Sequence, residues 1–375
     1  MGPQKAISMN VKRIRASRGM NQTAAAKAVG ISRQAFIAIE NGKTKEPRVS
    51  NLQSIADAFD VEVLDLLAES PKLNTVRFRS NSIKTKKDKA KKEQYLINIA
   101  YWLRDFNFLQ SVVDGKKEYG LKSVFDQIRQ IETIRPERAA KLAREALDVR
   151  GDEQPIRDIL DLMENAGIKM RTLSFDLEKF FGLSVSTDDG GPAIIVNSKE
   201  GITIERQIFT VAHELGHLLL HPAAYDPSET AESKQEEKEA DAFASYFLMP
   251  QKAFKKKWEE SYGLGFAEKV LHIKRFFGVS YLTVLYRLNV MGIADFRTLM
   301  FKFTANYEAQ YDEALDSHKE PIPLAKSDFV EDYFRLLVRK ALEKAEITIS
   351  RAAEILNVPL MDMRKMINAW AEIAT

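Results

Sequence analysis

The chain has 375 residues, of which 45% are hydrophobic and 29% charged, and its formal net charge at pH 7 is +3. These values are typical of a globular protein with room for two or three domains, and so small a net charge does not by itself indicate a nucleic-acid binder. The sequence contains no cysteine, no apolar run long enough to cross a membrane and no apolar core of a secretion signal. We therefore expect a cytoplasmic protein in which any metal is bound by His, Asp or Glu.

Residues 10 to 69 are predicted to form five short helices, and residues 1 to 8 an extension before them. Within "NQTAAAKAVGISRQAFIAIENGK", Gly30 suits the left-handed position that ends a helix, and the Ser32 hydroxyl can cap the next helix. Small and apolar side chains fall on the two faces that would pack together: Ala25, Ala26, Val29, Phe36 and Ile39. This pattern predicts a helix-turn-helix.

The start of the second helix of this motif is its predicted reading surface. Packing leaves Arg33 and Gln34 exposed there, and in a helix-turn-helix that end enters the major groove of DNA. Arginine pairs with guanine and glutamine with adenine in that groove. A helical bundle that binds protein rather than DNA is the alternative interpretation.

This stretch resembles the Cro/C1-type (XRE) helix-turn-helix domain of phage and bacterial repressors. The resemblance covers residues 10 to 69 and includes "ENG" and the tail "LQSIADAFDVEVLDLL", although Ala25 stands where the family usually has Leu. It implies binding to double-stranded DNA, with Gln22 on phosphate and Arg33 and Gln34 on bases. The full set of expected DNA contacts is Gln22, Ser32, Arg33, Gln34, Asn41 and Lys43.

Residues 70 to 149 are predicted to be a Lys-rich linker followed by helices. The stretch "KTKKDKAKKEQ", from Lys84 to Gln94, is interpreted as a solvated linker or helix face, with phosphate contact beside the DNA-binding domain as the alternative. Farther along, "YLINIAYWLRDFNFL" and "PERAAKLAREALD" have helical patterns.

Residues 150 to 260 have a mixed pattern that predicts a small α+β domain. The segments "IKMRTL" and "GPAIIVNS" are strand-like, and helices are expected at 205–221 and 232–249. The first of these helices contains "FTVAHELGHLLLH", which holds three of the five histidines of the chain. His213 and His217 lie one turn apart on one helix face, so both imidazoles can reach one metal ion, and Glu214 is placed as a general base.

The second helix, "EEKEADAFASYFLMP", offers carboxylates to the same site. Its apolar stripe, extended backward, places Glu236 and Glu237 on an otherwise buried face with Asp241 at its edge. A buried carboxylate needs a partner, and two histidines with one glutamate leave a position open for water, as catalytic zinc sites do. Asp241 can accept a hydrogen bond from a ligand histidine.

The two helices resemble those of the ImmA/IrrE family of metallo-endopeptidases, over roughly residues 150 to 255. The gluzincin spacing of the ligand four residues before the Asp selects Glu237, with Glu236 as the second choice. The resemblance implies one zinc ion (Mn²⁺ as an in vitro substitute), bound by His213, His217 and Glu237, with Glu214 as base. His221 is a candidate for substrate binding or oxyanion stabilisation, or is structural; the candidate oxyanion donors among the tyrosines are Tyr225, Tyr246 and Tyr262.

The resemblance also implies a role. These peptidases cleave Cro/C1-type repressors and so release phage, mobile-element or stress genes. In this chain the helix-turn-helix is fused ahead of the peptidase, so the substrate is either a separate repressor or the chain itself. We expect an extended substrate to pair with the edge of "GPAIIVN". Single-stranded DNA as activator and a homodimer are further candidate partners. The alternative is a DNA-binding regulator whose peptidase-like domain senses a signal without cleaving.

Residues 261 to 375 are predicted to be helical. The segment "ISRAAEILNVPLMDMRKMINAW" superficially resembles a second helix-turn-helix, with Ser350 as a cap and a turn at Asn357–Pro359, but no basic reading surface follows Pro359. A packing or dimerisation element is the favoured interpretation. The predicted fold class is thus mainly α, with a small α+β, gluzincin-like metallopeptidase domain and an N-terminal five-helix DNA-binding domain.

Overall fold

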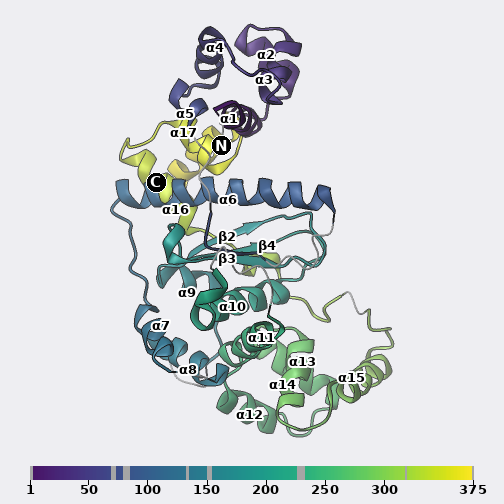
Figure 1. The fold of residues 1–375 in the computed structure, drawn as a ribbon. Helices are drawn as coiled ribbons and strands as arrows, with labels where there is room; N and C mark the ends of the chain where they lie inside the picture. Colours follow the sequence, from purple (N-terminus) through teal and green to yellow (C-terminus); the bar gives the residue numbers. More distant parts are fainter. Residues whose placement is uncertain are drawn as a thin grey trace. The chain divides into compact units, whose positions relative to one another are not determined.

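The computed structural model describes residues 3–68, 73–78, 85–131, 135–149, 154–225, 233–316 and 319–373. The chain is mainly helical and contains one small sheet (Figure 1), which confirms the predicted fold class. It divides into two compact units, each assembled from separated segments. One consists of residues 1–72, 94–116 and 332–375, and the other of residues 73–93 and 117–331.

The first unit begins with the five predicted helices, which enclose their own apolar core. Gly30 ends the second helix in the left-handed conformation at φ 75°, and the Ser32 side chain accepts a hydrogen bond from the Ala35 N–H, as expected. The helices are α1 (Pro3–Ser17), α2 (Gln22–Val29), α3 (Arg33–Glu40), α4 (Val49–Phe59) and α5 (Val63–Leu67).

The predicted N-terminal extension is wrong for the described residues 3–8, which belong to α1. Ala6 and Ile7 are buried, and the Ser8 hydroxyl donates to the Glu40 carbonyl oxygen over 2.6 Å. The first helix therefore begins before residue 10, because the side chains of Ala6 and Ile7 help to cover the helical core.

The remaining helices of this unit pack around α1 and the second half of α6 (Lys86–Val112). They are α16 (Tyr333–Glu343), α17 (Ile349–Leu356) and α18 (Leu360–Ile373). Glu354 of α17 binds Arg13 of α1 at 2.6 Å, and Asn357 ends α17 in a left-handed conformation at the expected turn. The cap of α17 is Thr348 rather than Ser350, because the helix begins at Ile349.

The Lys-rich stretch forms the start of α6 from Lys86 onward, and most of its side chains there are exposed. Lys84, with which the stretch begins, lies outside the described residues. The boundary between the two compact units falls within this helix. Within the parts of the chain that the structure describes, no helix combines the length and apolar character needed to cross a bilayer.

The second unit contains a four-stranded sheet in the order β1-β3-β4-β2. Its strands are β1 (Val76–Phe78), β2 (Lys169–Leu173), β3 (Gly182–Val185) and β4 (Ala193–Asn197). β3 pairs antiparallel with both β1 and β4, and β2 pairs parallel with β4. β2 and β4 were predicted; β1 and β3 were not.

The sheet order corrects one expectation about substrate. β4, the strand of "GPAIIVN", is hydrogen-bonded to β3 on one side and to β2 on the other. It therefore has no edge at which an extended peptide could pair, and all five of its residues are buried. β3 was not predicted because its four residues, "GLSV", are too few to show the alternation of apolar and polar side chains that indicates a strand.

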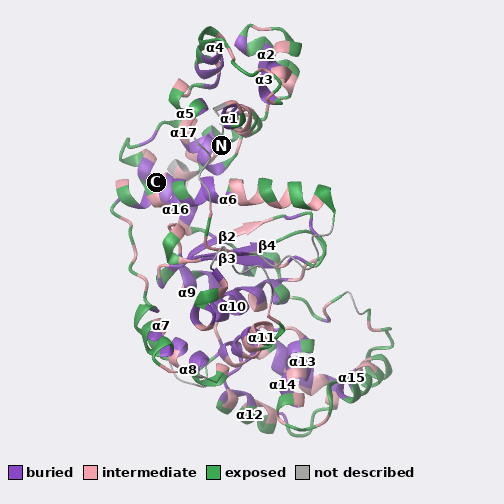
Figure 2. Cartoon of the chain, viewed as in Figure 1, coloured by how far each residue is buried: buried purple, intermediate pink, exposed green. Residues whose placement is uncertain are grey.

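Helices pack against this sheet and share an apolar core with it, as the burial pattern in Figure 2 shows. The central pair is α10 (Ile204–Leu220) and α11 (Lys234–Leu248), within two residues of the predicted bounds. A side chain at Gly216 of α10 would lie 3.0 Å from the Phe243 ring, so glycine allows the close approach of α11. The other elements are α7 (Lys122–Arg129), α8 (Pro136–Ala146), α9 (Ile159–Asn165), α12 (Gln251–Glu260), α13 (Phe266–Phe277), α14 (Tyr281–Val290), α15 (Phe296–Tyr311) and the 3₁₀ turns η1 (Thr187–Asp189), η2 (Pro222–Tyr225) and η3 (Lys326–Asp328).

Candidate metal centre

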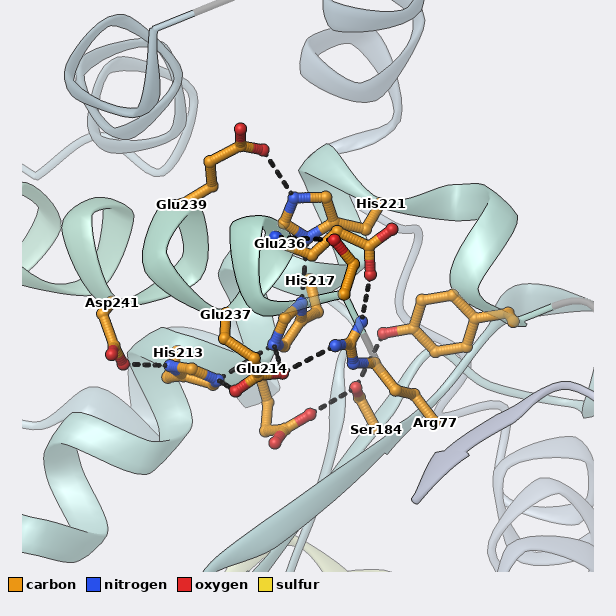
Figure 3. Close-up of polar contacts among 12 residues, drawn as sticks. Arg77, Ser184, His213, Glu214, His217, His221, Glu236, Glu237, Glu239 and Asp241 are labelled. Atoms are coloured by element: carbon orange, nitrogen blue, oxygen red, sulfur yellow. Dashed lines mark hydrogen bonds and ion pairs between the residues drawn. The ribbon is translucent and has the colours of Figure 1, made fainter. Parts of the chain in front are cut away.

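Helices α10 and α11 bring His213, His217 and Glu237 together (Figure 3). One donor atom from each residue lies within 4.8 Å of the other two. The Nε2 atoms of His213 and His217 are 2.9 Å apart. The Glu237 carboxylate places one oxygen 3.4 Å from Nε2 of His217 and the other 3.7 Å from Nε2 of His213. Three donors of the type that zinc prefers therefore converge on one point.

The other ring nitrogen of each histidine has a partner behind it. Nδ1 of His213 lies 2.8 Å from Oδ1 of Asp241. Nδ1 of His217 lies 2.9 Å from Nδ1 of His221, whose Nε2 is 3.0 Å from Oε2 of Glu239. Because the carboxylates can only accept, His213 carries its proton on Nδ1 and His221 carries its proton on Nε2.

This hydrogen-bond chain also fixes the proton of His217. Since Nδ1 of neutral His221 is then an acceptor, His217 donates from its own Nδ1. Burial lowers the pKa of His217 well below its usual range, and burial likewise lowers the pKa of His221, so both rings stay neutral. Nε2 of His217 is thus unprotonated, and it lies 2.9 Å from Nε2 of His213.

The Glu214 carboxylate is buried beside these histidines and is held by a strand residue. The Ser184 hydroxyl of β3 donates to Oε2 of Glu214 over 2.6 Å and lies 2.7 Å from the Tyr225 hydroxyl. Ser184 has one hydrogen to give, so Tyr225 donates to Ser184. Burial raises the pKa of Tyr225 well above its usual range, which keeps that phenol protonated.

Sequence reasoning missed Ser184, and it left three tyrosines open as donors to the site. Tyr225 is the one whose hydroxyl reaches the Glu214 network. Tyr262 is 94% exposed, and the Tyr246 ring packs 4.0 Å from the Arg287 guanidinium. The one sequence signal for β3 was the glycine at its first position, Gly182, where a side chain would lie 2.5 Å from Thr210.

A buried arginine, Arg77 of β1, also enters the centre and was not foreseen. Its Nη2 donates to Oε1 of Glu237 over 2.7 Å, and its Nη1 donates to Oε2 of Glu236 over 3.2 Å. Glu236, the second choice as ligand, thus faces Arg77 and is not one of the three grouped donors.

The acidic face of α11 is less buried than predicted. The side chains of Glu236 and Glu237 are 30% and 22% exposed, and that of Asp241 is 51% exposed. The prediction of an otherwise buried face was wrong for Glu236 and Glu237, because the apolar core against which α11 packs ends before its first turns, where Ala240 is the first buried residue. Asp241 was expected at the edge of that face, and its exposure agrees with this.

A cleft adjoins the centre along the start of α10. Phe181, Gly182, Arg206, Phe209 and Thr210 line it together with His213 and Glu214. A cavity of about 570 Å³ shares three of these residues and continues past Asp241 toward α14. The Arg206 guanidinium stacks on the Phe181 ring at 3.9 Å, so the region between cleft and cavity is both aromatic and positively charged.

The residues expected to contact DNA lie on α2, on α3 and in the turns that flank α3. Gln22 is half-buried and donates to Oε2 of Glu40, while Arg15 contacts Oε1 of the same carboxylate at 2.5 Å. Glu40 is therefore a buried anchor within the domain. The other expected contacts are all exposed: Ser32, Arg33, Gln34, Asn41 and Lys43.

The fold and this site define a helix-turn-helix domain joined in one chain to a metallopeptidase-like domain. Comparison with known families agrees with both parts. Residues 11–66 match the family model described as helix-turn-helix, and residues 163–289 match the one described as the IrrE N-terminal-like domain. The chain thus carries an XRE-type helix-turn-helix domain, which supports DNA binding, and an ImmA/IrrE-type peptidase domain, which suggests metallopeptidase activity.

Proposed function

We propose that this chain is a DNA-associated, zinc-dependent endopeptidase. It cleaves a helix-turn-helix repressor, or its own chain, and so derepresses phage, mobile-element or stress genes. The observation that carries the proposal is the convergence of His213, His217 and Glu237 beside the buried Glu214. A sensor without catalysis would not need a buried carboxylate beside three candidate metal ligands.

The donor set fits a divalent metal. The Nε2 atoms of His213 and His217 lie 2.9 Å apart, and the Glu237 carboxylate oxygens lie 3.4 and 3.7 Å from them. Imidazole nitrogens and carboxylate oxygens are ligands that zinc takes in proteins. Asp241 and the His221–Glu239 pair orient the two imidazoles from behind, as hydrogen-bonded partners do in zinc sites. A zinc ion held by His213, His217 and Glu237 would supply Lewis acidity, lowering the pKa of water and polarising a peptide carbonyl.

Glu214 acts as the general base in this proposal. Its carboxylate accepts a proton from the attacking water as the new C–O bond forms, and passes that proton to the amine nitrogen as the C–N bond breaks. Ser184 holds one carboxylate oxygen at 2.6 Å, which limits rotation of the side chain and leaves the second oxygen to take the proton. Glu214 is 2% exposed, so bulk water does not compete for it.

His221 has a positioning role in this proposal, in place of the expected substrate contact. It lies against Nδ1 of His217, the nitrogen on the far side of the ring from the converging Nε2 atoms. Its other nitrogen is held by Glu239. The pair therefore fixes the orientation and proton of His217.

The aromatic cleft and cavity beside α10 are the proposed site for substrate side chains. They adjoin both His213 and Asp241, so a peptide carbonyl presented to the centre would have a neighbouring side chain within reach of Phe181 and Phe209. A large apolar residue beside an acidic one would match the stacked Arg206.

The helix-turn-helix domain brings the peptidase to DNA or to a DNA-bound repressor. Arg33 and Gln34, exposed at the first turn of α3, are the proposed base contacts. Gln22, Ser32, Asn41 and Lys43 are the proposed contacts to the sugar-phosphate backbone.

The test compares wild type with Glu214→Gln. Each is assayed for cleavage of Cro/C1-type repressors whose genes lie next to the gene for this chain. Assays contain zinc and are run with and without single-stranded DNA. Glu214→Gln should keep its metal and fold but lose roughly 10²–10⁴-fold in rate. If wild type cleaves neither repressor nor itself in any condition, and Glu214→Gln regulates genes as wild type does, the non-cleaving sensor is correct instead.

A further inference from the structure

Strand β1 lies outside both segments that match known families, yet it completes the sheet beside the metal centre. It pairs antiparallel with β3, and the register places Arg77 opposite Ser184. Ser184 is the residue whose hydroxyl holds Glu214. Thus a short segment between the two family-matched domains runs along the strand that carries part of the catalytic network.

An extended substrate of this peptidase needs a free strand edge close to Glu214. β4 is enclosed on both sides by β2 and β3, so it provides none. β3 contacts Glu214 directly and borders the cleft through Gly182. Its outward edge is the position for an antiparallel peptide, and β1 occupies this edge along residues 183–185.

We propose that the outer edge of β3 is a docking site for an extended, arginine-containing peptide, and that the chain's own β1 is its resting occupant. β1 covers the docking site, and the ion pairs of Arg77 with Glu236 and Glu237 hold β1 in place. This inference rests on the proposed peptidase function. A substrate strand gains access when β1 leaves.

The contacts of Arg77 resemble those of a bound ligand side chain. Its side chain is 7% exposed, and its guanidinium pairs with both Glu236 and Glu237 (Figure 3). The Glu237 oxygen that it binds at 2.7 Å is the same oxygen that lies 3.4 Å from Nε2 of His217. A guanidinium cannot lose its proton, so a permanent cation competes there with any metal for one carboxylate oxygen.

β1 is a short strand, held by its register with β3 and by contacts of Arg77 and Thr75. It has three residues in register with β3. Just before it, the Ser186 hydroxyl donates to the Thr75 hydroxyl over 2.8 Å, and Asp189 accepts from the N–H groups of Asn74 and Thr75. Short elements with little buried surface open more readily than the core to which they attach.

The first experiment measures peptide binding without requiring catalysis. A fluorescein-labelled peptide of residues 73–78, LNTVRF, is titrated into the full-length chain and followed by fluorescence anisotropy. In wild type the internal strand occupies the site, which weakens apparent affinity by the fraction of open chains. Arg77→Ala removes two charged hydrogen bonds and should strengthen peptide binding by at least about tenfold.

Matched variants distinguish two reasons for a change in peptide binding: release of β1 and unfolding of the peptidase unit. A peptide with alanine in place of its arginine should bind Arg77→Ala at least about tenfold more weakly than LNTVRF does. Arg77→Lys keeps the charge but not the two-pronged geometry, so its affinity for LNTVRF should fall between those of wild type and Arg77→Ala. Circular dichroism and metal content of each variant report whether the peptidase unit remains folded.

The second experiment locks the strand. Because the chain has no cysteine, Thr75→Cys with Ser186→Cys introduces one pair, at side chains whose hydroxyls are 2.8 Å apart. In the Arg77→Ala background, the oxidised form should lose binding of LNTVRF and a phosphine reductant should restore it. Each single-cysteine variant under the same oxidation is the control.

The outcomes distinguish masking from peptidase activity. Equal affinity of wild type and Arg77→Ala for LNTVRF, or undiminished binding by the oxidised double-cysteine variant, would show that β1 is a permanent strand of the sheet. Cleavage of wild type within residues 73–78 would show that β1 is a substrate rather than a mask. If Arg77→Ala binds the peptide but cleaves no repressor, the docking site stands and the proposed function fails. If the locked chain cleaves repressors, masking fails and the peptidase stands.

Discussion

The choice between Glu237 and Glu236 as the third metal ligand can be decided with a matched pair of substitutions. Glu237→Gln and Glu236→Gln each replace one carboxylate on the same turn of α11 with a neutral isostere. Only the Glu237 carboxylate approaches both histidines, at 3.4 and 3.7 Å. The Glu236 carboxylate contacts Arg77 at 3.2 Å. The two variants therefore differ in distance to the centre and in little else.

The expected magnitude follows from the charge removed. Two unit charges about 4 Å apart attract by roughly 4 kcal/mol at an effective dielectric constant near 20, which corresponds to about 10³-fold in a dissociation constant. We expect Glu237→Gln to weaken zinc binding by about this factor. Glu236→Gln leaves all three donors in place, and we expect it to change zinc affinity by less than about tenfold.

Chelator competition on the full-length protein, with metal content measured by mass spectrometry, gives both dissociation constants. Far-ultraviolet circular dichroism controls for folding. Loss of zinc in Glu236→Gln with full retention in Glu237→Gln would refute the assignment of Glu237. Retention in both variants would refute a centre built from the two helices.

Three further predictions test the surroundings of the centre, the DNA contacts and a buried acid. His221→Ala should weaken zinc binding by roughly 10–100-fold, because it removes the partner of His217; His272→Ala, on α13, is the control, and equal affinities would contradict the positioning role. Gln34→Ala should weaken binding to an operator-like duplex by about 1–3 kcal/mol and relax its sequence preference. The measurement is a gel-shift series over salt concentrations. Equal binding of wild type and variant to all duplexes would instead support a scaffold role for the helix-turn-helix domain. Burial, followed by the nearby Glu331 carboxylate, raises the pKa of Glu164 from 4.5 to about 8. Since the folded state thus binds its proton more tightly than the unfolded chain, stability should fall as pH rises from about 5 to 8. Glu164→Gln should remove this part of the fall, so its Tm relative to wild type should increase over that range in scanning calorimetry; a constant difference would show that Glu164 ionises normally.

The parts of the site that could be predicted are those that local geometry determines. Helical spacing alone places His213 and His217 on one face, four residues apart, whatever packs around them. The same holds for the left-handed Gly30 and the cap at Ser32, since a helix end must satisfy its own backbone groups within a few residues. Both helices of the centre were accordingly expected within two residues of their bounds.

Local sequence only partly determines which carboxylate of α11 is the third candidate ligand. Helix periodicity put Glu236 and Glu237 beside each other and could not decide which would turn toward the histidines. Only the folded chain places the Glu237 carboxylate 3.4 and 3.7 Å from the two histidines. Arg77, which contacts both glutamates, lies more than 150 residues away in sequence. The exposure of Asp241 likewise depends on how far the apolar core reaches along α11.

The sequence by itself determined the helix-turn-helix, the paired histidines, the neighbouring Glu214 and the acidic helix that faces them, because each is encoded by spacing within one helix or turn. Tertiary structure alone decided that β4 is interior, that Ser184 holds Glu214 and that Arg77 enters the centre from β1. A strand can pair with segments that are distant in sequence. A strand of three or four residues has too little alternation of apolar and polar side chains to predict which segment that is. The edge available to a substrate, and the strand that covers it, therefore became visible only in the folded chain.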